Sequence, residues 1–556
     1  MKVTPATQLD EAADWIVGFR ADQIPPEIVS LARSQVIDTV AAICAGARSE
    51  LGGRMIRALE RVASPGPCTV LPKGDCWSVS DAVYLHSALA NALELDNFVL
   101  SGHFGQSAVA VGLALGEMLG ATCEEALSAQ IIGLEVATRL GAYISAGPQH
   151  GQMRSYAHRI AAASCASRLL KLDRGQTRRA LAVALAAPEF PLFPAAFSAD
   201  TKAILSSAPA VEGLRAAVLA EAGMDAEIDI LDHPLGLVGF FTYMDALPRV
   251  WERLGQSWFL HTLSTKTYAT CAYAQGAVTC ALRLRESGEL EPEAIESVVV
   301  RAPLTTIVME TLSRPHTGAG ATPVNTHFST RRSVAAAILF GPLTGDFFDA
   351  RFAPRAPTIQ AFSDRVSLSH DWALTVDLLR GVDAGLEGAG KPGLYGMGQA
   401  HRTLGKFKRI LGSRSPLAWT DLPDLFRLRG TDRAYLATRY WRGYRSRLPF
   451  AGGRAAAARY RSSEADLSRL SMRLGARLRV RLRSGKTLEE ECRIPPGFAG
   501  DPQREERMRD KFRREARPVL GSAAAGILAA LEEVPQGRVK DLFGPLRNAQ
   551  YGEAHV

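Results

Sequence analysis

A chain of 556 residues, 47% of them apolar and 22% charged, can bury a large core, and its length favours two or more domains. These values identify a globular protein. The eight cysteines contain no CxxC pair and no spacing typical of zinc ligands or of a disulfide framework, which favours a reducing compartment. The first residues lack a basic stretch before an apolar core, and the longest apolar stretch is interrupted by Glu189 and three prolines. We therefore predict a cytoplasmic protein without a membrane span or a metal site.

The net charge of +8 is distributed unevenly. Residues 401–461 carry fifteen Lys or Arg and three Asp, a net charge of +12, so the rest of the chain has a net charge of −4. Aromatic residues are interspersed with these arginines, as in surfaces that bind single-stranded nucleic acid, in amphipathic helices at membranes and in docking sites for acidic carrier proteins. A solvated insert has the same composition. No recognised motif supports nucleic acid, which we do not expect, and an acidic carrier protein stays a candidate partner of this basic insert.

From residue 9 to about residue 225, apolar residues recur at steps of three and four, which predicts one helix after another. The clearest helical patterns cover residues 27–46 and 107–144, where alanine-rich faces favour close packing. Typical signals of a helix end occur at Gly46, at Gly120 and at the Gly147-Pro148 pair. We predict an all-helical domain over residues 1–265.

After residue 265 the pattern changes to short segments rich in β-branched residues, which predicts strands. A smaller α+β domain is therefore predicted for residues 266–517, interrupted by the basic insert at about residues 380–470. Residues 383–401 are dense in glycine and predict a mobile linker. The tail is again helical, and helices at about residues 518–550 are expected to complete the first domain. The predicted strands are residues 294–303, 365–375, 476–485 and 486–494, the last two joined by a hairpin turn.

Residues 92–108 place Glu94, Asp96, Asn97 and His103 within an otherwise apolar, alanine-rich region. If the surrounding helices are buried, these groups must be hydrogen-bonded or line a cavity, because unpaired burial of such groups costs several kcal/mol. A carboxylate beside an imidazole is a common arrangement for moving protons near neutral pH. The alternative is an ordinary solvated loop at a helix end.

Three other segments contain groups suited to a binding site. Lys202 is the first cation of a stretch of small side chains and suits an anionic substrate. A second group precedes a helix, and a third lies at the predicted domain junction, where clefts often form. Taken singly, each is equally compatible with a structural role. The residues of the second and third groups are His150, Arg154, Tyr156, His158, Lys266 and Tyr268.

These stretches, in this order, resemble the MmgE/PrpD family, which includes 2-methylcitrate dehydratase, cis-aconitate decarboxylase and iminodisuccinate epimerase. The resemblance runs from about residue 28 to 375 and resumes near 475. The matching motifs are NALELDNF before His103, GQMRS before SRLLKLD, KAILSS from Lys202, KTYATC from Lys266, HFSTRRSVAAAI at residues 327–338, and VRLRSGKT and MRDKFRREA near the end.

The resemblance implies a mainly α fold: a large helical domain built from both chain ends and a smaller α+β lid domain, in a homodimer with the active site between the domains. It also implies removal of a proton next to a carboxylate, followed by loss of hydroxide or CO2 or by return of the proton on the other face. The resemblance implies no metal or organic cofactor. Asp96, His103 and Lys202 occupy matching positions.

The sequence departs from the family pattern at several polar positions. Histidines of the family correspond here to Gln152, Leu205 and Gln275, and neither Gln nor Leu exchanges a proton near neutral pH. Family activity therefore does not transfer directly. His158 or His150 is a candidate replacement for the histidine lost at Gln152. In the acidic stretch, two aspartates of the family correspond to Glu94 and Asn97, and its threonine corresponds to Phe98. The apolar residues Phe98 and Leu205 predict a larger or less charged substrate.

We predict an enzyme of the lyase type that moves a proton next to a carboxylate or carbonyl of a small molecule. The alternatives are an isomerase, epimerase or cyclase in specialised metabolite biosynthesis, or a catalytically weakened homologue that acts as a scaffold through the basic insert. The predicted catalytic residues are Asp96, His103, His158 and Lys202. The predicted substrate-binding residues are Glu94, Gln152, Arg154, Tyr156, Lys266, Tyr268 and Gln275.

Overall fold

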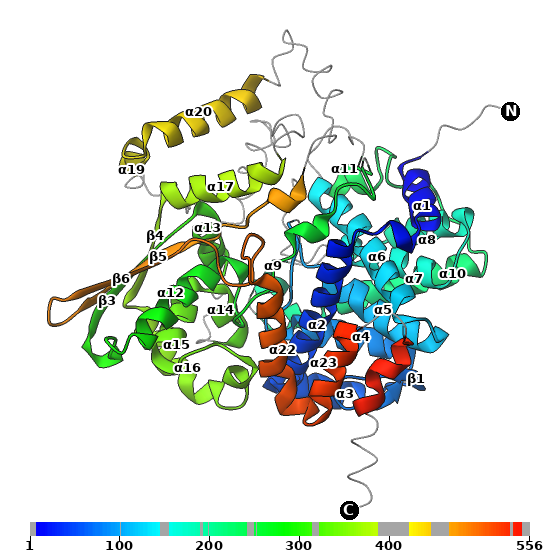
Figure 1. Ribbon diagram of the computed structural model, residues 1–556, viewed down its shortest axis with the longest axis horizontal. Helices are drawn as coiled ribbons and strands as arrows, with labels where there is room; N and C mark the ends of the chain where they lie inside the picture. Colours follow the sequence, from blue (N-terminus) through cyan, green and yellow to red (C-terminus); the bar gives the residue numbers. More distant parts are fainter. Residues whose placement is uncertain are drawn as a thin grey trace, which may run out of the picture.

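The protein consists of a large helical body and a smaller lobe built on a β-sheet, which lie side by side (Figure 1). The predicted fold class, mainly α with a smaller α+β part, is confirmed. The structure, a computed structural model, describes residues 7–100, 102–144, 155–189, 193–197, 199–241, 250–251, 253–313, 322–386, 422–445, 466–533 and 537–546.

The helical body contains, besides helices, a short antiparallel ladder of two strands, so its predicted all-helical character is not complete. The strands are β1 (Pro65–Thr69) and β2 (Cys76–Trp77). The helices are α1 (Gln8–Gly18), α2 (Pro26–Arg48), α3 (Glu50–Leu59), α4 (Val79–Ala92), α5 (Gly105–Leu119), α6 (Cys123–Ile144), α7 (Ser155–Leu169), α8 (Arg174–Ala186), α9 (Phe193–Phe197), α10 (Ser207–Glu221) and α11 (Leu237–Phe241). Short 3-10 helices are η1 (Ala21–Gln23), η2 (Asp200–Leu205) and η3 (Phe259–Thr262).

Small residues let the helices of the body pack closely, as the alanine-rich faces predicted. At the centre, α5 packs against α2, α4, α6, α7 and α10. Gly120 ends α5 in the left-handed conformation, with φ 63, as predicted. Gly46 does not end α2, which continues to Arg48; instead a Cβ at Gly46 would lie 2.1 Å from the carbonyl oxygen of Leu89, so glycine is needed where α2 crosses α4.

Two apolar helical stretches of the described chain are long enough to cross a bilayer, judged by length and composition. They are Pro26–Arg48 and Asp200–Glu221, and 83% and 61% of their most apolar windows are buried within the protein. Such burial is typical of core helices.

The second lobe is a four-stranded sheet in the order β4-β3-β5-β6, with β3 parallel to β4 and antiparallel to β5. All four predicted strands are present, but the second ends at His370, and the predicted strand residues 372–375 belong to helix α17. The hairpin between β5 and β6 turns at Gly485, with φ 84. The strands are β3 (Ile295–Ala302), β4 (Val366–His370), β5 (Ala476–Leu482) and β6 (Thr487–Cys492). The helices are α12 (Gln275–Glu286), α13 (Leu304–Leu312), α14 (Pro323–Phe328), α15 (Thr330–Phe340), α16 (Phe352–Ser363) and α17 (Trp372–Leu386), with the 3-10 helices η4 (Ala272–Ala274), η5 (Pro292–Ala294), η6 (Gly345–Phe348) and η10 (Leu467–Arg469).

One face of this sheet is apolar and the other is charged, as the alternation along the strands requires. Val298, Val300, Leu478 and Val480 are buried in a core shared with α12 and α15. The other face carries opposite charges on β5 and β6, as in the contact of Arg477 with Glu491. The sheet therefore has one solvated face.

The basic insert is described only in part. The predicted glycine linker does not begin at residue 383, because α17 remains helical to Leu386 and packs there against Leu470. Residues 387–421 and 446–465 lie outside the described residues, and so does most of the basic segment. Between them, α19 (Leu422–Phe426) leads to α20 (Gly430–Arg445), which packs on α17 through an ion pair of Arg380 and Asp432 at 2.8 Å.

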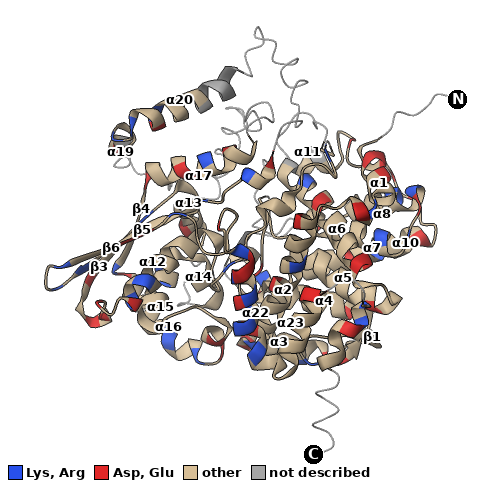
Figure 2. Ribbon diagram, in the orientation of Figure 1, with Lys and Arg blue, Asp and Glu red and all other residues tan. Residues whose placement is uncertain are grey.

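The chain returns to the helical body through α22 (Arg504–Leu520), followed by α23 (Ala523–Glu533) and η11 (Val539–Phe543). Met508 and Phe512 already belong to the core of the helical body, so this return begins earlier in the sequence than residue 518. In Figure 1, α22 lies between the two lobes and beside α2, and Figure 2 shows that it carries charges of both signs. A helix at this place can link the two lobes.

Lys511 of α22 makes the central contact of that link. Its Nζ lies 2.8 Å from Asp38 Oδ1 of α2 and also donates to the Leu95 carbonyl, and both charged side chains are buried. Asn97 Nδ2 donates to the other carboxylate oxygen at 3.1 Å, and Thr265 Oγ1 donates to Asp38 as well. The Asp38–Lys511 pair thus joins α2, the segment after α4, the domain junction and α22.

Replacing Lys511 by Met leaves the Asp38 carboxylate buried without its cation. Loss of one partner of a buried ion pair costs about 3–5 kcal/mol, so we expect a loss of this size in the free energy of unfolding, measured by urea titration. The double variant D38N/K511M removes the orphaned charge and keeps the acceptor, and it is expected to regain at least half of the loss. A loss in K511M below about 1 kcal/mol would contradict a structural role of this pair.

Candidate active site

The polar stretch that the sequence singled out is a loop, residues 93–104, between the buried helices α4 and α5. Its backbone pairs with the domain junction, because Phe98 and Ser264 exchange two hydrogen bonds at 2.9 and 2.8 Å. The helix that follows starts at Gly105, where a Cβ would lie 2.4 Å from Gln35 Nε2 and 2.5 Å from Asn97 Oδ1. Glycine therefore lets α5 begin directly against this loop.

Charged groups from three distant segments meet at this loop in what we call the ion cluster: Glu94, Asp96, His103, Lys202 and Lys266. Glu94 lies between the two lysines, with Oε2 at 2.5 Å from Lys202 Nζ and Oε1 at 2.8 Å from Lys266 Nζ. Lys266 Nζ also lies 3.0 Å from Asp96 Oδ1, and Asp96 Oδ2 lies 2.7 Å from His103 Nδ1. The order is therefore Lys202, Glu94, Lys266, Asp96, His103, and all five residues are buried.

Mutual pairing keeps the acids and Lys266 charged despite burial. Burial alone would raise the pKa of Glu94 and Asp96, but the attraction of Lys266, together with Lys202 at Glu94 and His103 at Asp96, lowers both values. Burial would lower the pKa of Lys266, and Asp96 and Glu94 raise it. With its φ of 53, Glu94 also adopts a left-handed backbone conformation that is unusual for a residue with a side chain, and its two ion pairs hold it there.

The two lysines differ in their remaining capacity for hydrogen bonds. Lys202 Nζ has three acceptors, the carbonyl and side-chain oxygens of Asn91 at 2.6 and 2.9 Å and Glu94 Oε2 at 2.5 Å, which match its three N–H groups. Lys266 Nζ has two acceptors within the described chain, Glu94 and Asp96. Lys266 can therefore donate one more hydrogen bond, whereas all three N–H groups of Lys202 are already used.

The Asp96 carboxylate determines which nitrogen of His103 is free. An ionised carboxylate can only accept, so Nδ1 of the neutral ring donates to it and Nε2 is left as the basic nitrogen. The ring of Phe98 lies 5.6 Å from the His103 ring and packs edge-on against Phe498 at 5.1 Å. His103 thus has an oriented imidazole with an apolar neighbour.

Three further imidazoles are wholly buried in the two lobes. His158 Nδ1 lies 2.7 Å from Ser107 Oγ, while its Nε2 has no partner in the described part of the chain. His86 Nε2 accepts the Leu71 N–H at 2.9 Å. Burial lowers the pKa of His158 and His327 to about 3 and that of His86 to about 4. All three rings are therefore neutral near pH 7.

The structure brings together only some of the predicted site residues. Tyr156 is buried in the helical core with its ring 5.2 Å from Phe241, and Tyr268 packs against the core of the second lobe. The side-chain amide of Gln275 is hydrogen-bonded to the backbone: Nε2 donates to the carbonyls of Tyr268 and Thr270 at 2.8 and 2.9 Å. These three residues are outside the ion cluster. The predicted residues His150, Gln152 and Arg154 lie outside the described residues.

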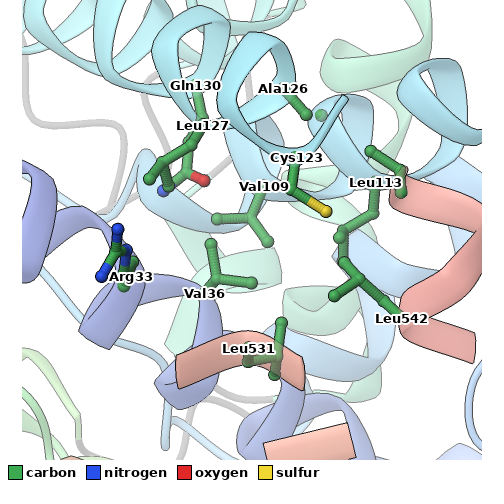
Figure 3. A pocket seen from close by; sticks show the side chains of 12 residues that line it. Arg33, Val36, Val109, Leu113, Cys123, Ala126, Leu127, Gln130, Leu531 and Leu542 are labelled. Atoms are coloured by element: carbon green, nitrogen blue, oxygen red, sulfur yellow. The ribbon is translucent and has the colours of Figure 1, made fainter. Parts of the chain in front are cut away.

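A small apolar pocket of the helical body lies away from the ion cluster. This pocket lies between α2, α5, α6 and the C-terminal helices (Figure 3). Its volume of about 30 Å³ has room for only a few water molecules. Val36, Val109, Leu113 and Leu542 are among its lining residues, and none belongs to the ion cluster. In the described chain, no group of three His, Cys, Asp or Glu side chains has the arrangement of a metal site.

The buried neutral imidazoles predict a loss of stability in acid. Their pKa values are lower in the folded than in the unfolded protein, so unfolding takes up protons and the free energy of unfolding falls as the pH decreases below about 6.5. His86→Gln keeps an acceptor for the Leu71 N–H and removes one such proton. We expect the mean slope between pH 6.5 and 5 to be smaller by about 1 kcal/mol per pH unit in this variant. Urea unfolding over this range measures both slopes, and equal slopes would show that folding does not lower the pKa of His86.

The sequence matches the MmgE/PrpD N-terminal domain over residues 10–247 and the MmgE/PrpD C-terminal domain over residues 268–382. It is also similar to two curated cis-aconitate decarboxylases of Aspergillus terreus. One is 25% identical over 285 residues, which are 48% of this chain and 58% of the relative. The other is 24% identical over 292 residues, 50% of this chain and 59% of the relative.

This chain thus matches less than two thirds of the length of these two relatives. The two family domains, in contrast, follow one another along more than half of the chain and in the order that the motifs predicted. The chain therefore belongs to the MmgE/PrpD family.

Proposed function

We propose that this chain is an enzyme that removes a proton from a carbon next to a carboxylate or carbonyl group. The observation that carries the proposal is the buried contact of His103 Nδ1 with Asp96 Oδ2 at 2.7 Å, which leaves Nε2 as a base. Loss of hydroxide or CO2 is the default outcome, because similar curated members of the family are named decarboxylases. The full activity and the substrate are part of this proposal.

In the proposed reaction, His103 Nε2 takes the proton from carbon, and the Asp96 carboxylate stabilises the imidazolium that forms. Negative charge develops at the same time on the oxygen of the substrate's carbonyl or carboxylate. Lys266 is the cation with a free N–H, so it is assigned to that oxygen. Lys202, which sequence analysis assigned to the substrate's charge, instead fixes Glu94 and the end of α4.

The proton must be delivered again when the leaving group departs or the product is protonated. The His103 imidazolium holds this proton and is the candidate donor, while the neutral ring of His158, whose Nε2 is unpaired in the described part of the chain, is a candidate hydrogen-bond partner of the substrate. Its bond to Ser107 Oγ fixes the ring. In this proposal His103 acts first as base and then as acid, and His158 offers a neutral hydrogen-bonding group.

An isomerase, epimerase or cyclase is the second candidate function. It needs removal and return of one proton but no acid for a leaving group. Gln275 favours it, because this amide braces the backbone and offers no proton to a leaving group. Analysis of the product distinguishes the two, since a lyase releases water or CO2 and an isomerase conserves the mass of the substrate.

Replacing His103 by Gln is expected to lower turnover by about 10²- to 10⁴-fold, because general base catalysis contributes about this factor. The assay incubates the purified protein in D2O with a metabolite extract of the source organism lacking this gene, and mass spectrometry follows consumption and deuterium uptake. His233→Gln is the matched control, since His233 is exposed and contacts only the nearby Leu235 N–H. Equal turnover of H103Q and wild type would remove His103 from the mechanism.

If the protein is instead a scaffold that acts through its basic insert, its effect depends on residues 401–461 and not on the ion cluster. In that case H103Q and K266M leave the metabolite profile of the source organism unchanged, and removal of residues 401–461 changes it. Consumption of a metabolite by the purified wild-type protein, lost in H103Q, contradicts the scaffold.

The balance of charge in the ion cluster predicts weak binding of small tricarboxylates. Two lysines already face two carboxylates, so each additional buried anion lacks a cation within the described residues, and an uncompensated buried charge costs several kcal/mol. We expect calorimetry to give a Kd for cis-aconitate weaker than about 1 mM, which corresponds to about −4 kcal/mol. Binding of cis-aconitate at micromolar concentration would contradict the less charged substrate that we propose.

A further inference from the structure

One buried imidazole near the ion cluster makes no hydrogen bond within the described residues. His327 lies in the last turn of α14, just before α15, and its side chain is 0% exposed. Neither Nδ1 nor Nε2 has a hydrogen-bond partner in the described part of the chain. His86 and His158, the other two buried neutral imidazoles, each have one.

Packing alone does not account for a histidine at this position. The ring lies edge-on against Phe348, with centroids 4.3 Å apart, a contact that a phenylalanine ring would make equally well. The residue's structural hydrogen bonds use its backbone, since its carbonyl accepts from Cys271 N and from Thr270 Oγ1, both at 2.8 Å. Buried polar groups without a partner are rare and destabilising, so two unpaired nitrogens need another explanation.

The surroundings of His327 connect it to the Lys202 end of the ion cluster. The charges of Lys202, Glu94 and Lys266 all act on its pKa, and the ring of the next residue, Phe328, lies 5.8 Å from Lys202 Nζ. The carbonyl of His327 is also bonded to the segment that carries Lys266. Two imidazoles therefore flank the cluster: His103 at the Asp96 end and His327 at the Lys202 end.

The ring is uncharged near pH 7, because burial and then the charge of Lys202 lower the pKa of His327 to about 3. A neutral imidazole offers one N–H donor and one acceptor nitrogen. It suits a hydroxyl or carbonyl group better than a second carboxylate, whose charge it does not neutralise.

We propose that His327 is a further substrate-contacting residue of this site, whose imidazole hydrogen-bonds a hydroxyl or carbonyl oxygen of the substrate. This inference rests on the proposed function, because it assumes that the substrate lies along the ion cluster. The substrate then carries a neutral polar group at some distance from the carbon that loses its proton to His103.

The test replaces His327 by Phe, which keeps the ring and its contact with Phe348 and removes both nitrogens. We expect H327F to unfold at the same or a higher temperature than the wild type, because no hydrogen bond is lost. We expect kcat/KM to fall about 10- to 100-fold, the size of one lost hydrogen bond to the substrate. The substrate is the metabolite that wild type consumes from the extract described above, after purification.

Two conservative variants locate the contact. His327→Asn and His327→Gln put a polar atom near the places of Nδ1 and Nε2, and one of them is expected to regain a substantial part of kcat/KM. His86→Phe is the control: it leaves the Leu71 N–H without its acceptor, so we expect a lower melting temperature and an unchanged kcat/KM of the folded enzyme. Turnover that depends on the buried nitrogens of His327 but not of His86 supports the assignment.

The results separate this inference from the function on which it rests. If wild type consumes the metabolite and H327F has a kcat/KM within about twofold of it, His327 does not contact the substrate and the proposed function still stands. If wild type consumes nothing, the proposed function fails and the inference fails with it. If H327F does not fold, full turnover of both H327N and H327Q overturns the inference.

Discussion

The structure depends on the pairing of four buried charges in alternating order, Lys202, Glu94, Lys266 and Asp96, with His103 at the end. Each of these groups alone would be too costly to bury, and each lies within hydrogen-bond distance of an opposite charge. When a buried ion pair is replaced by well-packed apolar residues, the stability of the protein is often unchanged or higher by about 1–4 kcal/mol. Stability alone therefore does not explain why this cluster exists in the middle of an alanine-rich core, and the proposed function offers a chemical reason.

The fold holds the cluster by fixing the loop that carries it, residues 93–104, at several points. Leu95 is held by Lys511 of α22, Phe98 by the backbone of Ser264, and Asn97 by Asp38 of α2. The polar side chains of the loop thus divide into two sets. Glu94, Asp96 and His103 enter the cluster, and Asn97 belongs to the Asp38–Lys511 pair, which joins segments from both ends of the chain.

Sequence patterns predicted what depends on local order. The helical periodicity, the strand alternation and the hairpin at Gly485 lie within short segments and were found at nearly the predicted residues. Asp96 and His103 are seven residues apart in one loop, so their proximity could be expected. The Asp38–Lys511 contact spans 473 residues and has no local signal. Gly46 has the signature of a helix end, but its role depends on where α4 crosses.

In the candidate site, too, the contacts between distant segments cannot be predicted from local sequence patterns. Glutamine at residue 275 was assigned to the substrate, but whether an amide meets a ligand or the neighbouring backbone depends on how the chain turns around it. In the sequence, His327 is only part of a motif that indicates the fold, since neither its burial nor its lack of partners among the described residues can be seen there. Lys202 and Lys266 were both assigned to the substrate, and only the number of acceptors around each distinguishes them.

The alternation of charges in the cluster suits one kind of reaction. In the reaction that we propose, a positive imidazolium and a negative oxygen form together when His103 takes a proton from carbon, so the total charge of the site does not change. Asp96 already faces the new cation and Lys266 has a free N–H for the new anion, so neither charge requires the surroundings to reorganise. A substrate with additional carboxylates brings charge that this arrangement does not match. The cluster is therefore better suited to separating charge within a weakly charged substrate than to attracting a highly charged one.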